Sequence, residues 1–211
     1  MREILFSLFV LLCLRIEFVD CGHHKHHSVA QENVCALNKE GICNHQLHKI
    51  RSRDEFGAMA TERNFTIGAE LGVQTGWYSD MFLYGATTMK KYILVDTWKQ
   101  RSNYSDNANV DDAAQEATLN NCRQRLSPYS HRTQLDFMRM WTTEAAKKVP
   151  DNSVDFIYVD ARHDYCGVME DIEAWWPKLR PGGVMAGDDY LTEPEHIKIK
   201  GGLRDPNDDW G

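Results

Sequence analysis

The sequence contains no run of lysines and arginines, and its formal net charge is −7 at pH 7 over 211 residues. A nucleic-acid-binding domain normally carries a basic patch, so this charge balance argues against a general nucleic-acid binder. The same lack argues against electrostatic attraction to a membrane surface. With 42% hydrophobic and 26% charged residues, the composition is typical of a globular domain.

An apolar run long enough to span a membrane comfortably is also missing near the N-terminus. The apolar stretch 4–14 follows Arg2 and has the length of a signal-peptide core. We therefore predict a signal peptide over 1–21, with an uncleaved anchor as the alternative. Residues 22–64 then form an N-terminal extension, partly disordered over 22–32, where "HHKHH" reads as a flexible tail rather than a metal site.

Two further features agree with entry into the secretory pathway, either its lumen or secretion. Asn64-Phe65-Thr66 and Asn103-Tyr104-Ser105 fit the acceptor pattern for N-glycosylation. Removal of the leader leaves an even number of cysteines, which an oxidising compartment permits to pair: Cys35, Cys43, Cys122 and Cys166. We favour a Cys35–Cys43 pair and interpret Cys166 as a small buried residue that starts a helix.

From residue 65 onward, apolar runs typical of buried strands alternate with helical patterns. The expected strands are 65–71, 91–96, 133–140, 154–160 and 184–190, and the expected helices are 76–86, 111–126, 142–149 and 167–176. Such alternation predicts an α/β domain over 65–211 with a doubly wound, mostly parallel sheet. The polar stretch 97–131 is long for a connection, which is typical of a lid or substrate loop.

Acidic side chains stand at the carboxyl ends of the predicted strands, which is where such sheets bind ligands. They are Glu70, Asp96, Asp160, Asp188 and Asp189. An unpaired carboxylate among buried strands is costly, so their convergence predicts a cationic ligand. Solvated loop acids are the alternative.

The loop after the first strand reads Glu70-x-Gly72-x-x-x-Gly76. Glycines there let the backbone approach a ligand at a helix N-terminus. The G-x-G-x-x-G pattern of nicotinamide oxidoreductases is absent, because an acid replaces its first glycine. Asp96 follows Gly76 by 20 residues, a position suited to accepting hydrogen bonds from ribose hydroxyls.

These motifs resemble those of the class I S-adenosylmethionine-dependent methyltransferases. "ELGVQTGWYS" (70–79) resembles the first motif of catechol O-methyltransferases, and "VDARHDY…WWPKLRPGGVMAGDDY" (159–190) resembles a branch that includes macrolide sugar O-methyltransferases. The resemblance covers about 65–190 and implies a Rossmann-like fold and a metal-dependent O-methyltransferase. The family usually adds a helix and two strands after the fifth strand, and the chain is expected to lack them.

The resemblance also implies roles for individual residues. Glu70, Gly72 and Gly76 would hold the methionine part of S-adenosyl-L-methionine, and Asp96 its ribose. The adenine would lie between two pairs of residues, Thr97 with Trp98 and Trp141 with Thr142. The ligands of Mg²⁺, or of Mn²⁺, would be Asp160, Asp188 and Asp189. His163 would be the general base, with Asp160 as the next candidate; alternatively His163 only orients Asp160.

The resulting expectation is metal-assisted methyl transfer to a hydroxyl of a sugar, a glycan or a small hydroxylated metabolite. Two alternatives remain open: a non-catalytic binding protein of the secretory pathway that has kept the fold, and an NAD-dependent oxidoreductase. The expected partner is a small-molecule or glycan acceptor, with no nucleic acid and no membrane contact beyond the leader. An exposed sheet edge would also permit a homo-oligomer.

Overall fold

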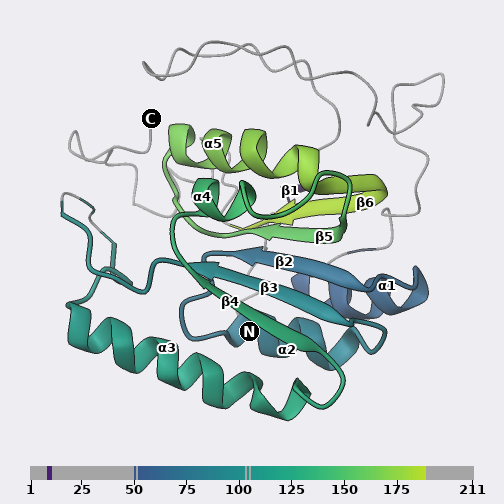
Figure 1. Ribbon diagram of the computed structural model, residues 1–211, viewed down its shortest axis with the longest axis horizontal. Helices are drawn as coiled ribbons and strands as arrows, with labels where there is room; N and C mark the ends of the chain where they lie inside the picture. Colours follow the sequence, from purple (N-terminus) through teal and green to yellow (C-terminus); the bar gives the residue numbers. More distant parts are fainter. Residues whose placement is uncertain (1–8, 11–49, 51, 103, 105, 189–211) are drawn as a thin grey trace, which may run out of the picture.

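The computed structural model describes residues 9–10, 50, 52–102, 104 and 106–188 of the chain. Within them, one six-stranded sheet has the order β1-β6-β5-β2-β3-β4 (Figure 1). The neighbours from β6 to β4 are parallel, so the predicted α/β class with a doubly wound, mostly parallel sheet is confirmed. The strands are β1 (Phe9–Val10), β2 (Ile67–Leu71), β3 (Lys91–Asp96), β4 (Gln134–Arg139), β5 (Val154–Val159) and β6 (Leu179–Gly187).

The short strand β1 falls inside the predicted signal peptide and pairs antiparallel with β6, Phe9 opposite Gly187 and Val10 opposite Ala186. The rest of 1–21 lies outside the described residues, and the signal peptide stays a prediction. The histidine-rich tail also lies outside the described residues, and so does the region after β6, where the chain was expected to lack a helix and two strands. Both expectations stay predictions. In the described part of the chain, no helix has the length and apolar character that a membrane span requires.

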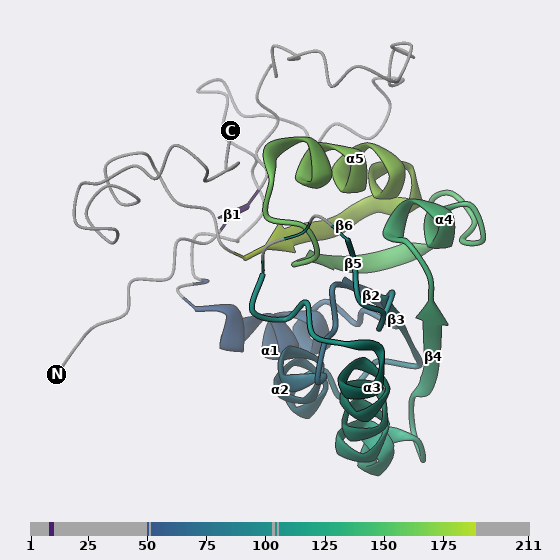
Figure 2. The same cartoon turned by 90° about the vertical axis from the view of Figure 1, so that its left-hand side faces the viewer.

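Helices cover both faces of the sheet (Figures 1 and 2). One face carries α1 (Phe56–Glu62), α2 (Trp77–Gly85) and α3 (Asp112–Leu126), and the other carries α4 (Thr142–Ala146) and α5 (Tyr165–Trp175). The sequence sets two helix starts clearly. The Asp111 carboxylate accepts a hydrogen bond from the Ala114 N–H at 2.9 Å, and Asp164 does the same for Gly167 at 2.9 Å. Both are N-caps, which satisfy amide groups that the first turn leaves unpaired.

Two apolar cores form because side chains alternate between the faces of each strand. Tyr92 and Leu94 of β3 pack toward α1, α2 and α3, together with Phe156 and Tyr158 of β5. The intervening strand residues pack toward α4 and α5; they include Ala69, Leu71, Ile93, Val95, Ile157 and Val159. Burial on both sides explains why β2, β3 and β5 read as nearly continuous apolar runs.

The helix α1 was not predicted, because its residues fall in the range 22–64 that the sequence assigned to an extension. Phe56 and Ala60 are fully buried and Met59 nearly so. The Phe56 ring lies 5.4 Å from Phe156 and 6.3 Å from Tyr158, centroid to centroid. Residues 53–62 therefore belong to the packed domain, beginning with the 3-10 helix η3 (Arg53–Glu55).

Two other expectations need correction. The last parallel strand begins at Leu179 rather than after the "RPGG" turn, and an irregularity opposite Val154–Phe156 absorbs that turn within β6. Cys166 lies at the second position of α5, as expected for a helix start, but it is half-buried and disulfide-bonded. Cys122 is buried and free. The favoured Cys35–Cys43 pair lies outside the described residues.

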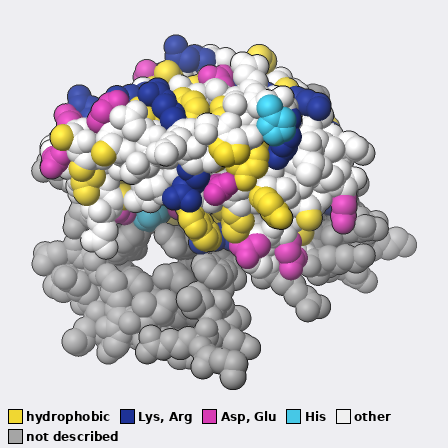
Figure 3. Space-filling model, turned by 90° about the horizontal axis from the view of Figure 1, so that it is seen from below, with side chains coloured by type: hydrophobic (Ala, Val, Ile, Leu, Met, Phe, Trp, Pro, Cys, Tyr) yellow, Lys and Arg dark blue, Asp and Glu magenta, His cyan; other side chains and the backbone are white. Residues whose placement is uncertain are grey.

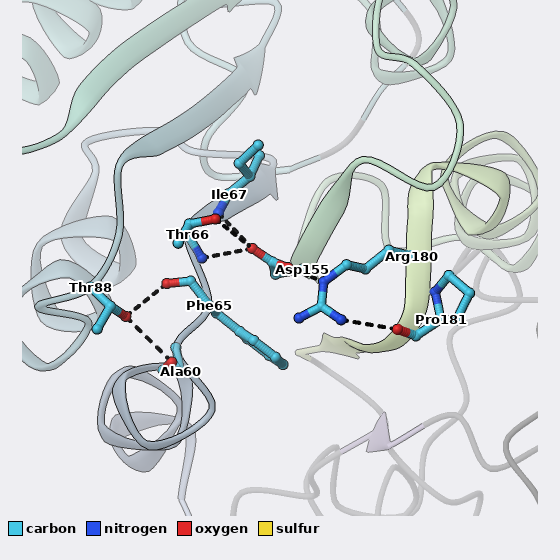
Figure 4. Close-up of polar contacts among 8 residues, drawn as sticks. All are labelled: Ala60, Phe65, Thr66, Ile67, Thr88, Asp155, Arg180 and Pro181. Atoms are coloured by element: carbon cyan, nitrogen blue, oxygen red, sulfur yellow. Dashed lines mark hydrogen bonds and ion pairs between the residues drawn. The ribbon is translucent and has the colours of Figure 1, made fainter.

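A buried carboxylate ties three strands together at one end of the sheet (Figure 4). The opposite end carries Asp96, Asp160 and Asp188 at the tips of β3, β5 and β6, and we call it the acidic rim. Asp155 of β5 accepts hydrogen bonds from the Thr66 and Ile67 amides at 2.6 and 2.8 Å, and it pairs with Arg180 of β6. Burial alone would disfavour its charge. The hydrogen bonds from Arg180, Ile67 and Thr66 outweigh that penalty, and they lower the pKa of Asp155. This anchor fixes the register of β2 between its neighbours.

Candidate functional site

The strand order places three of the five predicted acids along one edge of the sheet. Asp96 ends β3, while Asp160 and Asp188 directly follow β5 and β6. The backbone links these tips: the Asp160 amide donates to Leu71 at 2.8 Å, and the Asp188 amide donates to Val159 at 3.1 Å. Asp189 lies outside the described residues.

The predicted glycine loop turns sharply between β2 and α2. Gly72 has φ +86°, and a Cβ built on it would lie 1.8 Å from the Asp160 carbonyl oxygen. Only glycine allows the loop after β2 to approach the loop after β5 so closely. Gly76 is the N-cap of α2 with φ +72°, and its Cβ position is blocked by the Cys122 sulfur of α3 at 2.7 Å. Gly76 thus serves helix packing as well as the turn.

Asp96 is held in place by two backbone amides. One carboxylate oxygen accepts the Gln74 amide hydrogen at 2.9 Å, and the other accepts that of Trp98 at 2.8 Å. Gln74 and Trp98 both have positive φ, +49° and +39°, which is costly for residues other than glycine. Two strained residues therefore aim their N–H groups at one carboxylate. Such strain is characteristic of ligand sites.

Glu70 occupies a different layer from the other acids. Its side chain is 1% exposed and faces the α2 side of the sheet, where it accepts hydrogen bonds from the Ser79 and Tyr92 hydroxyls at 2.5 and 3.1 Å. Burial and the nearby charges of Asp160 and Asp96 raise the pKa of Glu70 to about 8. The two hydrogen bonds lower the pKa, but their effect is smaller. The carboxyl lies beneath the rim, so its predicted direct contact with the cofactor's methionine part stays a prediction.

The predicted adenine-site residues line the rim around β3 and β4. Trp98 is completely buried and its indole N–H donates to the Gln74 carbonyl at 2.9 Å. Trp141 is 49% exposed, and the Arg101 guanidinium lies 4.3 Å above its ring. Arg101 also donates to Thr97 at 3.4 Å. The structure thus brings Thr97 and Trp141 together through Arg101, a residue that the sequence analysis did not select.

Thr142 is turned toward the helix layer. Its hydroxyl donates to the Asp171 carboxylate of α5, and its carbonyl accepts the Trp175 indole N–H at 3.0 Å. Thr142 therefore joins α4 to α5, and its place beside an adenine stays a prediction.

His163 and Asp160 lie side by side, as the predicted base and its neighbour should. The His163 Nε2 atom is 3.5 Å from Asp160, and Nδ1 is 3.4 Å from Asp106. Asp106 comes from the loop after β3, inside the polar connection 97–131. The imidazole therefore bridges that loop to the tip of β5. The contact with Asp106 had no signal in the sequence, because nothing in the pattern relates residues 57 positions apart.

Of the predicted metal ligands, Asp189 lies outside the described residues and Asp188 already has a cationic partner. Asp188 is ion-paired with the Arg53 guanidinium, and the two side chains are only 13% and 20% exposed. A dication would have to share that carboxylate with a fixed positive charge. In the described part of the chain, no group of three or more His, Cys, Asp or Glu side chains is arranged to hold a metal.

Comparison with known protein families decides the class of this domain. A family model described as a methyltransferase domain matches residues 69–190, more than half of the chain. The chain belongs to the methyltransferase-domain family. The match covers the sheet from β2 to β6 with its acidic rim, and it confirms the predicted S-adenosylmethionine-dependent methyltransferase domain.

Individual relatives are more distant or cover little of the chain. The uncharacterized protein y4gI of Sinorhizobium fredii is 46% identical over 48 residues, which are 23% of this chain and 5% of that protein. This chain therefore spans only a small part of that relative's length. A putative caffeoyl-CoA O-methyltransferase from Staphylococcus aureus has a solved structure with a TM-score of 0.52 and 16% identity, covering 74% of this chain and 64% of that one. This likeness shows the fold.

A second solved structure is that of the O-methyltransferase TomG from Streptomyces achromogenes, in complex with S-adenosylmethionine. It has 14% identity and a TM-score of 0.48, covering 74% of this chain and 59% of that one.

Proposed function

We propose that this protein transfers the methyl group of S-adenosyl-L-methionine to a hydroxyl of a sugar, a glycan or a small hydroxylated metabolite. The observation that carries the cofactor assignment is Asp96, whose two oxygens are each fixed by the amide of a strained residue. A carboxylate set this way at the tip of β3 is suited to accept hydrogen bonds from both ribose hydroxyls. The family match agrees with this assignment.

The acceptor would be deprotonated at the tip of β5. Methyl transfer is an in-line displacement in which the acceptor oxygen forms a bond to the methyl carbon as the carbon–sulfur bond breaks. The hydroxyl proton passes to the His163–Asp160 pair, and the donor leaves as neutral S-adenosylhomocysteine. Holding donor and acceptor in line removes much of the entropic cost of their encounter. The contacts of His163 with Asp160 and Asp106 support this proposed role.

Metal assistance by Mg²⁺ or Mn²⁺, predicted from Asp160, Asp188 and Asp189, has no part in this mechanism. The pairing of Asp188 with Arg53 leaves the described carboxylates poorly suited to a dication. No step is therefore assigned to a metal.

The proposed location is the secretory pathway. Cys166 is disulfide-bonded, and disulfides persist mainly in oxidising compartments. Asn64 of the first sequon is exposed just after α1, where a glycan would have access. Peptide mass spectrometry with and without glycosidase treatment checks the second point.

The proposed activity is tested with S-adenosylmethionine carrying a tritiated methyl group and a panel of sugars and small polyhydroxylated acceptors. We expect His163→Ala to lower turnover by about 100-fold or more, as for loss of a general base, while S-adenosylhomocysteine affinity stays near that of the wild type. His131→Ala is the matched control, because His131 is exposed and, among the described residues, its ring bonds the Pro128 carbonyl of its own turn. Binding of the cofactor without transfer to any acceptor would favour the non-catalytic alternative.

A further inference from the structure

Arg53 enters the acidic rim from an element that the core holds firmly. It is the first residue of η3, which runs directly into α1. Phe56, three residues later, is fully buried against the Phe156 and Tyr158 rings of β5. The backbone that carries Arg53 is therefore fixed relative to the strand whose tip bears Asp160.

The Arg53 side chain is held by two contacts of different kinds. Its guanidinium is ion-paired with Asp188, and it lies 5.2 Å from the centre of the Trp77 ring at the start of α2. A guanidinium above an indole gains a cation–π interaction, which a hydrated metal ion in the same space would not reproduce as well. One side chain thus connects η3, α2 and the tip of β6.

The surroundings favour a permanent positive charge at this point. Burial of Arg53 works against its charge, but Asp188, Tyr158 and Asp160 outweigh that penalty, and they raise its pKa. The buried Tyr158 hydroxyl interacts with the guanidinium and contributes to this shift. Among the described residues, the carboxylates that raise this pKa are those of Asp188 and Asp160, at the ends of β6 and β5.

A divalent cation and this guanidinium exclude each other. Mg²⁺ and Mn²⁺ require several oxygen ligands in a nearly octahedral shell. Two positive centres on one partly buried carboxylate would repel strongly, because solvent screens them weakly there. Conversely, removal of the guanidinium would take a positive charge away from the carboxylates at the neighbouring strand tips.

We infer that Arg53 supplies the permanent positive charge beside Asp160 and Asp188, where the acceptor would bind, and that it takes the place of a divalent metal. The assignment rests on the methyl-transfer function proposed above. It makes methyl transfer by this protein independent of added metal, with Arg53 acting as a positioning residue for Asp188 and Asp160.

The test is a titration of the full-length protein with Mn²⁺ alone, followed by electron paramagnetic resonance of the free ion. We expect the wild type to show no Mn²⁺ site that depends on Asp188. Arg53→Met, which keeps an apolar chain against Trp77, should gain Mn²⁺ affinity by at least about tenfold. The double variant Arg53→Met/Asp188→Asn should lose that gain.

Two comparisons make the result specific. The histidines at 23–27 can bind Mn²⁺ weakly in every variant, so only the part removed by Asp188→Asn counts. Arg123→Met is the matched control. Arg123 belongs to α3, lies over the Phe137 ring of β4 and pairs with no rim acid among the described residues. Circular dichroism shows whether each variant is folded.

Wild-type binding of Mn²⁺ that Asp188→Asn abolishes would overturn the inference, because the metal site would then be native. An Arg53→Met variant that is folded but gains no affinity would also overturn it. Neither outcome requires cofactor or acceptor, so failure here is distinct from failure of the methyl-transfer assay.

Discussion

At the scale of single residues, a side chain's place depends on which face of its strand it occupies. Glu70 was grouped with the rim acids because it stands near the end of an apolar run. It is the fourth residue of β2, on the face that packs against α2, so it is buried beneath the rim. Asp96 ends its strand and was placed correctly. The sequence shows that an acid lies near the end of a strand. It does not show whether that side chain faces a helix layer, as Glu70 does, or lies at the strand tip, as Asp96 does.

Glu70→Gln should change how stability depends on pH. The folded-state pKa of Glu70 is raised from 4.5 to about 8, so between these values the native state binds the proton more tightly than the unfolded state. Glu70 therefore supports stability at low pH, and this support is lost as pH rises toward 8. Urea denaturation gives the free energy of unfolding of the wild type and of Glu70→Gln. The wild-type value minus the variant value should fall by a few kcal/mol from pH 5 to 8. Glu116→Gln, half-exposed, should show no such trend.

Gly72→Ala should be strongly destabilising because of the Asp160 carbonyl. The added Cβ would lie 1.8 Å from that oxygen, so the loop after β5 must move. Gly182→Ala is the matched control: Gly182 also has positive φ, +81°, but its nearest neighbour is the Arg180 side chain at 3.6 Å. Thermal unfolding should show about 1 kcal/mol lost for Gly182→Ala and at least about 3 kcal/mol for Gly72→Ala. Equal losses would show that Asp160 is not constrained by this contact.

Arg53 could not have been found from the sequence. The acids that it faces lie more than 100 positions away, and no local pattern marks a lone arginine as their counter-ion. Asp106 beside His163 is a similar case. Both contacts arise from tertiary packing, so only the arrangement of strand tips and the η3 segment reveals them.

At the scale of elements, the sequence predicted most strands and helices to within a few residues, because burial on both faces leaves nearly continuous apolar runs. One exception is α1, which lies in a polar region. Its signal was present: Phe56, Met59 and Ala60 have the i, i+3, i+4 spacing of a buried helix face. The predicted last strand began too late, because "RPGG" reads as a turn. In the structure these four residues are accommodated within β6.

The anchor at Asp155 should matter more than a surface pair of the same kind. Asp155→Asn removes the charge that holds Arg180 and two amides of the chain entering β2, so we expect about 3 kcal/mol lower stability at pH 7. The pKa of Asp155 is lower in the folded state than in the unfolded state. The stabilisation is therefore complete above the unfolded-state pKa and is lost as pH falls through the folded-state pKa. Asp136→Asn, in the partly exposed pair with Lys91, should cost less than about 1 kcal/mol. Urea denaturation from pH 3 to 7 compares the two.

At the scale of the whole molecule, the strand order could be predicted only as far as the α/β rules allow. Alternation gives a parallel sheet, but the order β6-β5-β2-β3-β4 comes from the structure and is what brings the acids of β3, β5 and β6 to one rim. Away from that rim, Figure 3 shows basic, acidic and apolar side chains intermixed on the face seen from below in Figure 1.

The most direct measurement is isothermal titration calorimetry of the full-length protein with S-adenosylhomocysteine and, separately, with NAD. We predict saturable binding of S-adenosylhomocysteine, at least about tenfold weakening by Asp96→Ala, and no binding of NAD. Asp112→Ala, whose carboxylate bonds only the exposed Gln100 amide among the described contacts, should leave the affinity unchanged. Absence of S-adenosylhomocysteine binding, or binding that Asp96→Ala does not weaken, would contradict a cofactor site at this rim.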